Sequence, residues 1–334
     1  MTALRLGTRR SALARTQSET VAADLRAATG REVELVEVTT HGDTSSAPLA
    51  QIGGTGVFTS ALRDALLTGR VDLAVHSLKD LPTAPADGLA LAAVPARQDP
   101  RDVLVARDGL TVDTLPSGSR VGTGSPRRAA QLRALRQDVD VCDVRGNVDT
   151  RLRAVADGTL DAVVLARAGL LRLGRAEEAT QVLDPQQMLP APGQGALALE
   201  CRADDAETFA ACQALDDVTT RACTDAERAV LAGLEAGCSA PVGALAVAAQ
   251  GVLDLRALVA APDGTRVLRH DVSGPADAAA ELGRSLAAAL LARGAAELVP
   301  DHPPPTPPPD LTPPSDQTQT LATGSRGAAQ ESDS

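Results

Sequence analysis

Apolar residues recur along the first 96 residues with two different spacings, which predict strands and helices in alternation. The segment 11–29 is typical of a helix, and Ser11 can cap its first turn. The segment 32–39 alternates between polar and apolar side chains, as a half-buried strand does. The strands predicted in this part cover 4–7, 32–39, 72–76 and 89–94, and the helices cover 11–29 and about 57–68.

The pattern restarts after a polar stretch at 97–101, which we interpret as a crossover between two lobes. Strands alternating with helices indicate open α/β layers, and two similar halves joined by a short crossover indicate a cleft between them. The strands predicted in the second half cover 103–106, 120–122, 139–144 and 160–166, and its helices cover about 126–136 and a segment from Asn147.

The remaining third of the chain predicts a small separate α/β domain. A strand at 196–201 can return to the first lobe, and a long helix at 218–236 ends at Gly237. Three strands (243–248, 252–260, 266–272) and a helix at about 276–293 follow. The predicted division is 1–96 with 196–214 as lobe 1, 101–190 as lobe 2, 218–299 as the C-terminal domain and 300–334 as a tail.

The tail is expected to be disordered, because its proline runs and polar residues bury too little apolar surface to offset chain entropy. A ligand of a proline-recognition module is the alternative. The tail holds five acids and one arginine, so it contributes −4 to the net charge of −11 and leaves −7 on the body. An acidic body is a poor binder of nucleic acid or anionic membrane, and any anion site must be built locally.

Aromatic residues make up 1% of the chain, which argues against a base-stacking platform for single-stranded nucleic acid. The five cysteines form no C-x-x-C pair and the four histidines are scattered, so neither a disulfide framework nor a metal site is expected. The sequence shows no signal-peptide apolar region after Met1 and no uncharged run of 18 apolar residues. We therefore expect a cytoplasmic protein.

Four polar clusters follow predicted strands, at the sheet edge where open α/β proteins place their ligands. Three lead into helix N-termini, whose free N–H groups favour anions, and arginine adds bidentate recognition of carboxylate or phosphate. Exposed surface arginines are the alternative for any single cluster, but four equivalent ones in an acidic protein favour an anion site. The clusters are Thr8-Arg9-Arg10-Ser11, Ser77-Leu78-Lys79-Asp80, Thr123-Gly124-Ser125-Pro126-Arg127-Arg128 and Arg145-Gly146-Asn147 through Arg151.

Lys79 is the only lysine of the chain, and Asp80 lies directly beside it. Among cations the Asp80 carboxylate is expected to stay ionised, so that it can stabilise a developing cation or move a proton; a helix-capping or salt-bridged aspartate is the alternative. Cys238 follows a helix in a loop and is a candidate covalent attachment point, whereas the other four cysteines are expected in the core.

In their order along the chain, these motifs closely resemble those of the porphobilinogen deaminase (hydroxymethylbilane synthase) family. The resemblance covers about 1–300 and is specific as a set. The matching stretches are Leu6 to Ser11, Gly53 to Phe58, Val75 to Pro82, Asp99 to Asp102, Gly122 to Arg128, Arg145 to Arg151, Pro192 to Ala196 and Gly237 to Pro241.

The resemblance implies two lobes like those of periplasmic binding proteins and a C-terminal domain that carries the cysteine loop. It implies a dipyrromethane cofactor held by a thioether to Cys238, onto which four porphobilinogens are condensed with loss of ammonia before hydrolysis releases hydroxymethylbilane. The implied enzyme is a cytoplasmic, monomeric transferase of tetrapyrrole and heme biosynthesis.

The resemblance also implies residue roles. Asp80 would be catalytic, steadying the azafulvene-like cation left when ammonia departs. The implied cofactor-binding residues are Lys79, Ser77, Thr123, Ser125, Arg127, Arg128 and Gly146. The implied substrate-binding residues are Arg9, Ser11, Gln17, Arg145, Arg151 and Gln194. Every pyrrole ring carries an acetate and a propionate, so guanidinium groups suit both ligands.

Two departures from the family pattern lie in one loop, where Gln51 and Thr55 replace lysines that relatives often carry. Two other functions explain part of the pattern. A non-catalytic two-lobed binding protein for a small polycarboxylate accounts for the arginines but needs neither Asp80 nor Cys238. A ligand-sensing domain of a transcription regulator lacks a recognisable helix-turn-helix module in this sequence.

Overall fold

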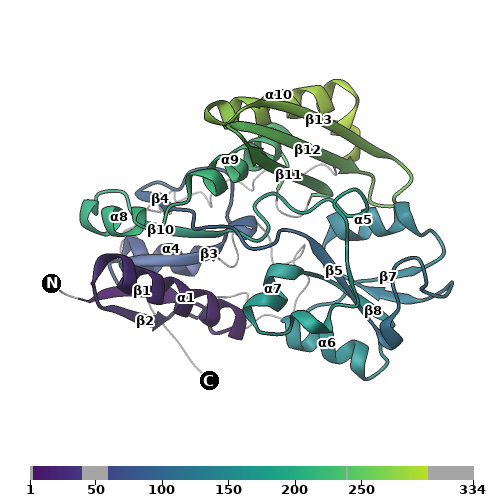
Figure 1. Cartoon of the computed structure of the whole chain (residues 1–334), viewed down its shortest axis with the longest axis horizontal. Helices are drawn as coiled ribbons and strands as arrows, with labels where there is room; N and C mark the ends of the chain where they lie inside the picture. The colour runs from purple at the N-terminus through teal and green to yellow at the C-terminus, as the bar shows by residue number, and fades with distance from the viewer. Residues whose placement is uncertain (1–2, 40–58, 238–239, 300–334) are drawn as a thin grey trace, which may run out of the picture. The chain divides into compact units, whose positions relative to one another are not determined.

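The computed structural model describes residues 3–39, 59–237 and 240–299, and these residues form three β-sheets with their covering helices (Figure 1). Cys238, Gln51, Thr55 and the tail at 300–334 lie outside the described residues. The α/β architecture with two sheet-containing lobes and a small C-terminal domain is confirmed. Met1–Pro300 is one unit by its internal packing, so the finer boundaries of the lobes stay predictions.

The sheet of the first lobe has the strand order β2-β1-β3-β10-β4. β1 is parallel to β2 and β3, and β10 runs antiparallel to β3 and β4, so the chain does return to the first lobe as predicted. Leu25 of α1 and Cys212 of α8 pack on one face, and Leu62 of α4 packs on the other. The elements are β1 (Leu4–Thr8), α1 (Ala12–Thr29), β2 (Val33–Glu37), α4 (Ser60–Leu67), β3 (Leu73–Ser77), β4 (Leu89–Ala93), β10 (Leu197–Arg202) and α8 (Ala206–Gln213).

The sheet of the second lobe repeats this plan in the order β7-β6-β8-β5-β9. Its antiparallel strand β5 is the first element after the chain leaves lobe 1, just as β10 is the first strand after it leaves lobe 2. Leu132 of α5 packs on one face, and Leu152 of α6 and Leu170 of α7 pack on the other. The elements are β5 (Asp102–Ala106), β6 (Arg120–Gly122), α5 (Pro126–Leu135), β7 (Asp140–Cys142), α6 (Val148–Ala156), β8 (Ala162–Ala166), α7 (Arg167–Arg172) and β9 (Gln181–Val182).

The C-terminal domain is a three-stranded antiparallel sheet, β11-β12-β13, with two helices. Leu253, Leu255 and Ala257 of β12 face these helices, whereas Leu258 and Ala260 pack with Ala130 of α5 in the second lobe. Because successive side chains of a strand point to opposite faces, one face of β12 packs on the helices of its own domain and the other packs on lobe 2. The elements are α9 (Val218–Gly233), β11 (Val242–Ala249), β12 (Val252–Ala260), β13 (Val267–Pro275) and α10 (Ala279–Ala292).

The predicted strands and long helices are present, with shifted ends. The helix predicted to end at Gly237 stops at Gly233, because the chain turns at Glu235, whose φ is 52°. The predicted helix at 276–293 begins with a 3-10 turn. α7, α8 and β9 were not predicted from the sequence. The 3-10 turns are η1 (Leu78–Asp80), η2 (Arg107–Gly109), η3 (Ala176–Glu178), η4 (Ala276–Ala278) and η5 (Ala295–Leu298).

Candidate active site

The four polar clusters follow β1, β3, β6 and β7 at their carboxyl ends, as predicted. Three begin helices: the Oγ of Ser11 accepts from Ala14 N at 3.3 Å, Ser125 Oγ from Arg128 N at 3.5 Å, and Asn147 Oδ1 from Thr150 N at 2.9 Å. Pro126 occupies the first turn of α5, where its missing N–H costs nothing. The fourth cluster forms the η1 turn that carries Lys79 and Asp80.

The two lobes meet at the side chain of Gln194, which is only 1% exposed. Its Oε1 accepts hydrogen bonds from Lys79 Nζ at 3.5 Å and from Arg128 Nη2 at 3.3 Å. Its Nε2 donates to Pro100 O at 2.7 Å and to Asp102 Oδ1 at 2.9 Å. One amide therefore connects the η1 turn of the first lobe with β5 and α5 of the second.

The backbone on either side of Gln194 requires glycine. Gly193 and Gly195 have φ angles of 74° and 89°, in the left-handed region that favours glycine. A Cβ at Gly195 would lie 2.5 Å from the carbonyl oxygen of Gln98, so no side chain fits there. The loop can thus approach the crossover segment closely enough for Gln194 to reach both lobes.

A second carboxylate, that of Asp102, lies among the basic side chains, which the sequence did not predict. The Asp102 carboxylate is fully buried, with Oδ2 2.8 Å from Arg127 Nη1 and Oδ1 2.8 Å from Arg128 Nη2. Burial raises the pKa of Asp102, but the two guanidinium groups and the Gln194 amide outweigh it and hold the pKa at about 2. Asp102 is therefore a fixed negative charge between the two arginines.

Arg127 and Arg128 are buried rather than exposed, so the surface-arginine alternative is wrong for this pair. Arg128 also donates to Val164 O at 3.1 Å, and Arg127 donates to Leu189 O at 2.5 Å. The Nε of Arg127 is enclosed and has no hydrogen-bond partner among the described residues. Burial lowers the pKa of Arg127, and an anion that accepts from this N–H would repay part of that cost.

The side chain of Lys79 is half-buried, and protein atoms packed around it remove much of the water from its surroundings. This desolvation lowers its pKa to about 8, against the opposing effect of Asp80, while Arg128 lowers it further. Arg151 on α6 behaves in the same way: burial and the charge of Arg128 lower its pKa to about 10, and its Nε has no hydrogen-bond partner in the described part of the chain. A carboxylate ligand beside these two side chains would stabilise their charged forms and offset the effect of burial.

These electrostatic effects show which predicted residues share one region. Lys79 is influenced by Asp80, Asp102, Arg127 and Arg128, and Arg151 is influenced by Arg128, Asp143, Arg145 and Asp80. The cations of this region (Lys79, Arg127, Arg128, Arg145 and Arg151) therefore outnumber its carboxylates (Asp80, Asp102 and Asp143). Asp80 itself is exposed, so its carboxylate is open to a ligand.

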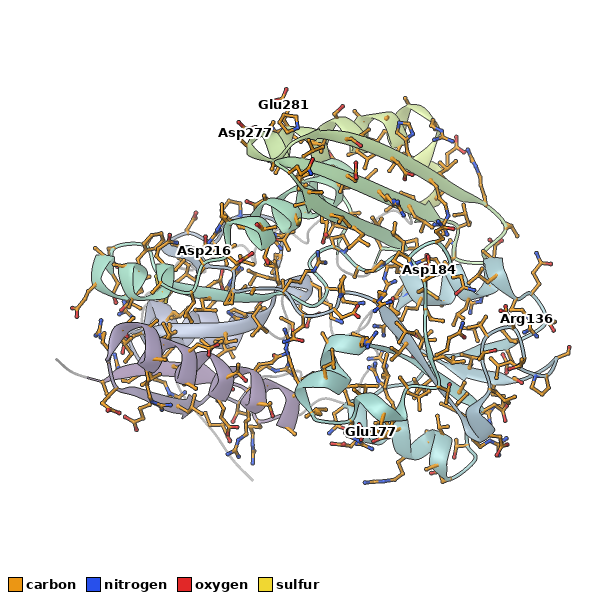
Figure 2. The ribbon with its side chains drawn as sticks, viewed as in Figure 1. Arg136, Glu177, Asp184, Asp216, Asp277 and Glu281 are labelled. Carbon is orange, nitrogen blue, oxygen red and sulfur yellow. The ribbon has the colours of Figure 1, made fainter. Side chains whose placement is uncertain are left out.

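Part of the negative charge of the protein lies away from this cluster. Figure 2 shows the labelled Glu177, Asp277 and Glu281 on the outside of the ribbon, and all three side chains are exposed. A local positive cluster within an acidic protein is what the sequence predicted for an anion site.

The other predicted residues lie at the same strand ends. Gln17 Nε2 donates to Ser77 Oγ at 3.3 Å, and Thr123 Oγ1 accepts from Ser125 N at 3.2 Å. Arg145 lies 3.5 Å from Asp143, and Arg9 directly follows β1. Gly146 has a φ of 102°, and a Cβ there would lie 2.8 Å from Thr150 Cβ. Among the described residues, no group of three or more His, Cys, Asp or Glu is arranged to hold a metal ion.

Sequence reasoning missed Arg172 as well as Asp102. Arg172 on α7 donates from Nη2 to Gly195 O at 2.7 Å, and burial lowers its pKa to about 10. It is the last residue of the short helix that follows β8, but α7 has only six residues and no side-chain cap, so the sequence carried little signal for it.

The cysteines other than Cys238 are mostly core residues, as predicted. Cys201, Cys212 and Cys223 are buried, and burial raises the pKa of Cys201 to about 11 and that of Cys212 to about 12. Cys142 differs from the prediction because it is only half-buried at the end of β7. High thiol pKa values make the buried cysteines poor nucleophiles.

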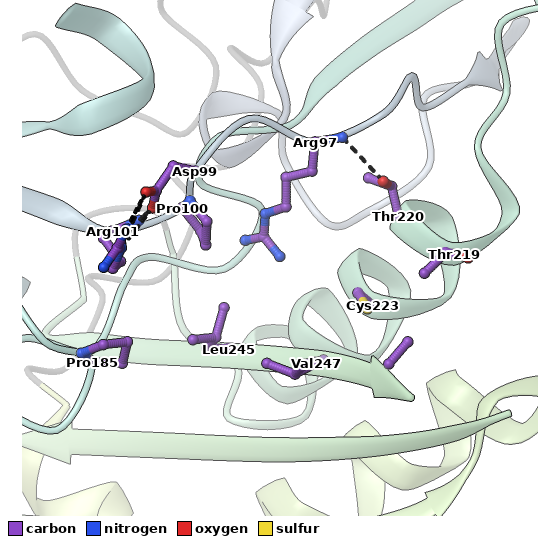
Figure 3. Close-up of a pocket in the computed structure, with 12 residues that line it drawn as sticks. Arg97, Asp99, Pro100, Arg101, Pro185, Thr219, Thr220, Cys223, Leu245 and Val247 are labelled. Atoms are coloured by element: carbon purple, nitrogen blue, oxygen red, sulfur yellow. Dashed lines mark hydrogen bonds and ion pairs between the residues drawn. The ribbon is translucent and has the colours of Figure 1, made fainter. Parts of the chain in front are cut away.

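A cavity of about 460 Å³ lies apart from the predicted residues, between the crossover segment and the C-terminal domain (Figure 3). Arg97, Thr220 and Cys223 line it together with Leu245 and Val247 of β11. Arg97 is bound by Glu227, with Nη1 2.6 Å from Oε1 and Nη2 3.0 Å from Oε2. The cavity is therefore a feature of the packing between the crossover and this domain.

Two family models match most of the chain. Residues 4–210 match "Porphobilinogen deaminase, dipyromethane cofactor binding domain", and residues 221–292 match "Porphobilinogen deaminase, C-terminal domain". The chain belongs to the porphobilinogen deaminase family. This family comprises transferases of tetrapyrrole biosynthesis.

Curated relatives agree over nearly their whole length. Porphobilinogen deaminase 1 of Streptomyces avermitilis is 59% identical over 315 residues, which cover 89% of this chain and 97% of that protein. Porphobilinogen deaminase of Mycobacterium tuberculosis is 55% identical over 305 residues, covering 89% and 98%. Among solved structures, a periplasmic substrate-binding protein from Coxiella burnetii has a TM-score of 0.42 and 13% identity, covering 64% of this chain and 91% of that one.

The donors present fit the cofactor that the family model names. Dipyrromethane rings carry carboxylates, and the site offers the enclosed, unpartnered Nε atoms of Arg127 and Arg151 together with the weakly bound ammonium of Lys79. Charge-assisted hydrogen bonds from such groups are among the strongest that a protein forms. The chemistry of the site and the family's cofactor therefore agree.

Proposed function

We propose that this chain condenses four porphobilinogen molecules with loss of ammonia and releases hydroxymethylbilane. The observation that carries the proposal is the meeting of Lys79 and Asp80 from one lobe with Arg127 and Arg128 from the other, around Gln194. A mixed cluster of this kind offers carboxylate binding and a carboxylate of its own in one place. When bound, the dipyrromethane supplies the pyrrole carbon to which substrate is joined.

We assign the binding of the cofactor's carboxylates to Lys79, Arg127 and Arg128. The strand ends around these side chains are shaped by Ser77, Thr123, Ser125 and Gly146. Arg127 and Arg128 suit a ligand that stays bound, because Asp102 and backbone carbonyls fix both guanidinium groups. A fixed donor loses little entropy when it binds a ligand.

We assign the incoming substrate to Arg9, Ser11, Gln17, Arg145 and Arg151. Arg151 connects the two groups, since its charge interacts with both Arg128 and Asp80. Gln194 was predicted with this group as well. Its buried amide already bonds to four protein groups, which supports a role in holding the lobes together around the ligand.

We assign the catalytic role to Asp80. Its exposed carboxylate lies directly beside Lys79, in the η1 turn that follows β3. Loss of ammonia leaves a positive charge on the substrate's methylene carbon, which a nearby carboxylate stabilises. The same group can hold the pyrrole N–H and move the proton released when the new bond forms.

We further propose that Cys238 attaches the cofactor by a thioether and that the enzyme works as a cytoplasmic monomer. Support for the attachment comes from the sequence, in which the segment Gly237-Cys238-Ser239 follows α9, which ends at Gly233. Within the described residues, no helix has the length and apolar character of a membrane span.

Turnover of porphobilinogen by the Asp80→Asn variant tests the catalytic assignment. The amide keeps the shape of the side chain but not its charge, so we expect turnover to fall by about 100-fold or more with little change in thermal stability. Near-normal turnover would make Asp80 a structural residue. Binding of the tetrapyrrole by a wild-type protein that consumes no porphobilinogen would instead support a non-catalytic binding protein.

A further inference from the structure

The turn that carries Lys79 and Asp80 is held from outside its own lobe. Arg228, on α9 of the C-terminal domain, donates from Nη1 to Leu81 O at 2.9 Å and to Leu78 O at 3.5 Å. Its Nη2 donates to Pro82 O at 2.7 Å. One guanidinium thus binds carbonyl oxygens on both sides of Asp80, and hydrogen bonds from a charged donor are stronger than neutral ones.

The segment that follows Asp80 borders a cavity where it faces α9 and α10. A cavity of about 560 Å³ is lined by Pro82 to Ala86, by Asp225 and Arg228 of α9 and by Arg284 of α10. Leu78 and Leu81 are buried in a small apolar cluster, and Leu81 also lines this cavity. Because a cavity provides fewer packing contacts than a filled core, the hydrogen bonds of Arg228 contribute much of what fixes the turn where it borders the cavity.

The residue before Arg228 on α9 binds the loop that carries Gln194. Glu227 is fully buried, and its Oε2 accepts from Gly193 N at 2.7 Å while both its oxygens bind Arg97. Gly193 directly precedes Gln194. Two consecutive residues of one helix therefore bind the loop of Gln194 and the turn of Asp80, and the same helix leads toward Cys238.

We propose that Arg228 is a positioning residue of this enzyme, which fixes the η1 turn so that Asp80 faces the reacting carbon of the tethered chain. This inference rests on the proposed role of Asp80. Misplacement of a catalytic group by about 1 Å can cost about 100-fold in rate, so loss of the three hydrogen bonds is expected to act on turnover.

The decisive comparison is Arg228→Gln against Arg284→Gln, both in the full chain carrying its cofactor. Arg284 lines the same cavity but is exposed, so its variant is the matched control for loss of a cation there. We expect kcat to fall about 10- to 100-fold in Arg228→Gln, with KM for porphobilinogen within about 3-fold of wild type. We expect Arg284→Gln to keep wild-type kcat.

Arg228→Lys separates positioning from folding, because it keeps the charge and part of the donor geometry. We expect its kcat to lie between those of wild type and Arg228→Gln, and amide hydrogen exchange in the peptide covering 78–86 to follow the same order. Equal loss in Arg228→Gln and Arg284→Gln, or wild-type kcat in Arg228→Gln, would overturn the inference. Near-normal turnover of Asp80→Asn would instead refute the proposed role of Asp80, and the hydrogen-exchange order would still report on the turn.

Discussion

Replacing Lys79 with methionine should stabilise the protein when no cofactor is bound. Burial lowers the pKa of Lys79 from 10.5 to about 8, so folding at pH 7 forces a charged ammonium into surroundings that disfavour it. A difference of about 2.5 in pKa corresponds to about 3 kcal/mol, at about 1.36 kcal/mol for each unit. Because the side chain keeps some contact with solvent, we expect a gain of about 1–3 kcal/mol in the free energy of unfolding.

The pH dependence identifies the cause. The folded-state pKa lies below the unfolded value, so between about pH 8 and 10.5 the unfolded chain binds more protons and the penalty disappears as pH rises. The advantage of Lys79→Met should therefore be complete at pH 7 and largely lost near pH 10. Urea unfolding of both proteins, in a Cys238→Ser background that cannot form the thioether, measures this difference.

Arg153→Met is the control, since it removes an exposed cation from α6 and should change stability by less than about 0.5 kcal/mol. A Lys79→Met protein that is less stable than its parent at pH 7, or whose advantage is the same at pH 7 and 10, would refute this reasoning. Lys79 would then pay no desolvation cost, and the cluster around it would not be poised for an anion.

Two further variants test a buried group of charges inside each lobe. Asp102→Asn leaves Arg127 and Arg128 buried without their carboxylate, so we expect thermal unfolding to show a loss of about 3–5 kcal/mol, and an unchanged Tm would contradict the assignment. Glu200, 2.8 Å from Arg63 and 3.1 Å from His76, has a pKa held at about 2 by these partners against burial, so its contribution should be present above about pH 4.5 and lost as pH falls toward 2. Acid unfolding of Glu200→Gln should therefore lack part of the wild-type slope in that range, and identical acid titrations would argue against the ion pair.

The sequence predicted much of the fold because local patterns determined it. β1 and α1 follow from alternating and helical spacing, and Ser11 caps α1 as expected. The return of β10 to the first lobe was predicted without a local pattern that establishes it, because antiparallel pairing with β3 depends on contacts over more than a hundred residues. The end of α9 was missed because a left-handed Glu235 has no clear sequence signal.

The sequence predicted which basic residues form the site but not the hydrogen bonds and ion pairs that hold them. Lys79, Arg127 and Arg128 stood out as cations at strand ends, and the structure places them together. Asp102 was noted only as the end of a matching stretch, just before the strand predicted at 103–106, because it gains its role only through partners 26 and 92 residues away. Arg228 sits in a helix among other charged residues, and only the folded chain shows that it binds the carbonyls around Asp80.

Intact-protein mass spectrometry of the purified wild type beside Cys238→Ser tests the central assignment most directly. If Cys238 carries the pyrrole primer and Lys79, Arg127 and Arg128 bind its carboxylates, the wild-type mass exceeds that of the polypeptide by two deaminated porphobilinogen units. The mass of Cys238→Ser then equals the mass calculated from its sequence. An active wild type with no added mass, or an equal excess on Cys238→Ser, would contradict it.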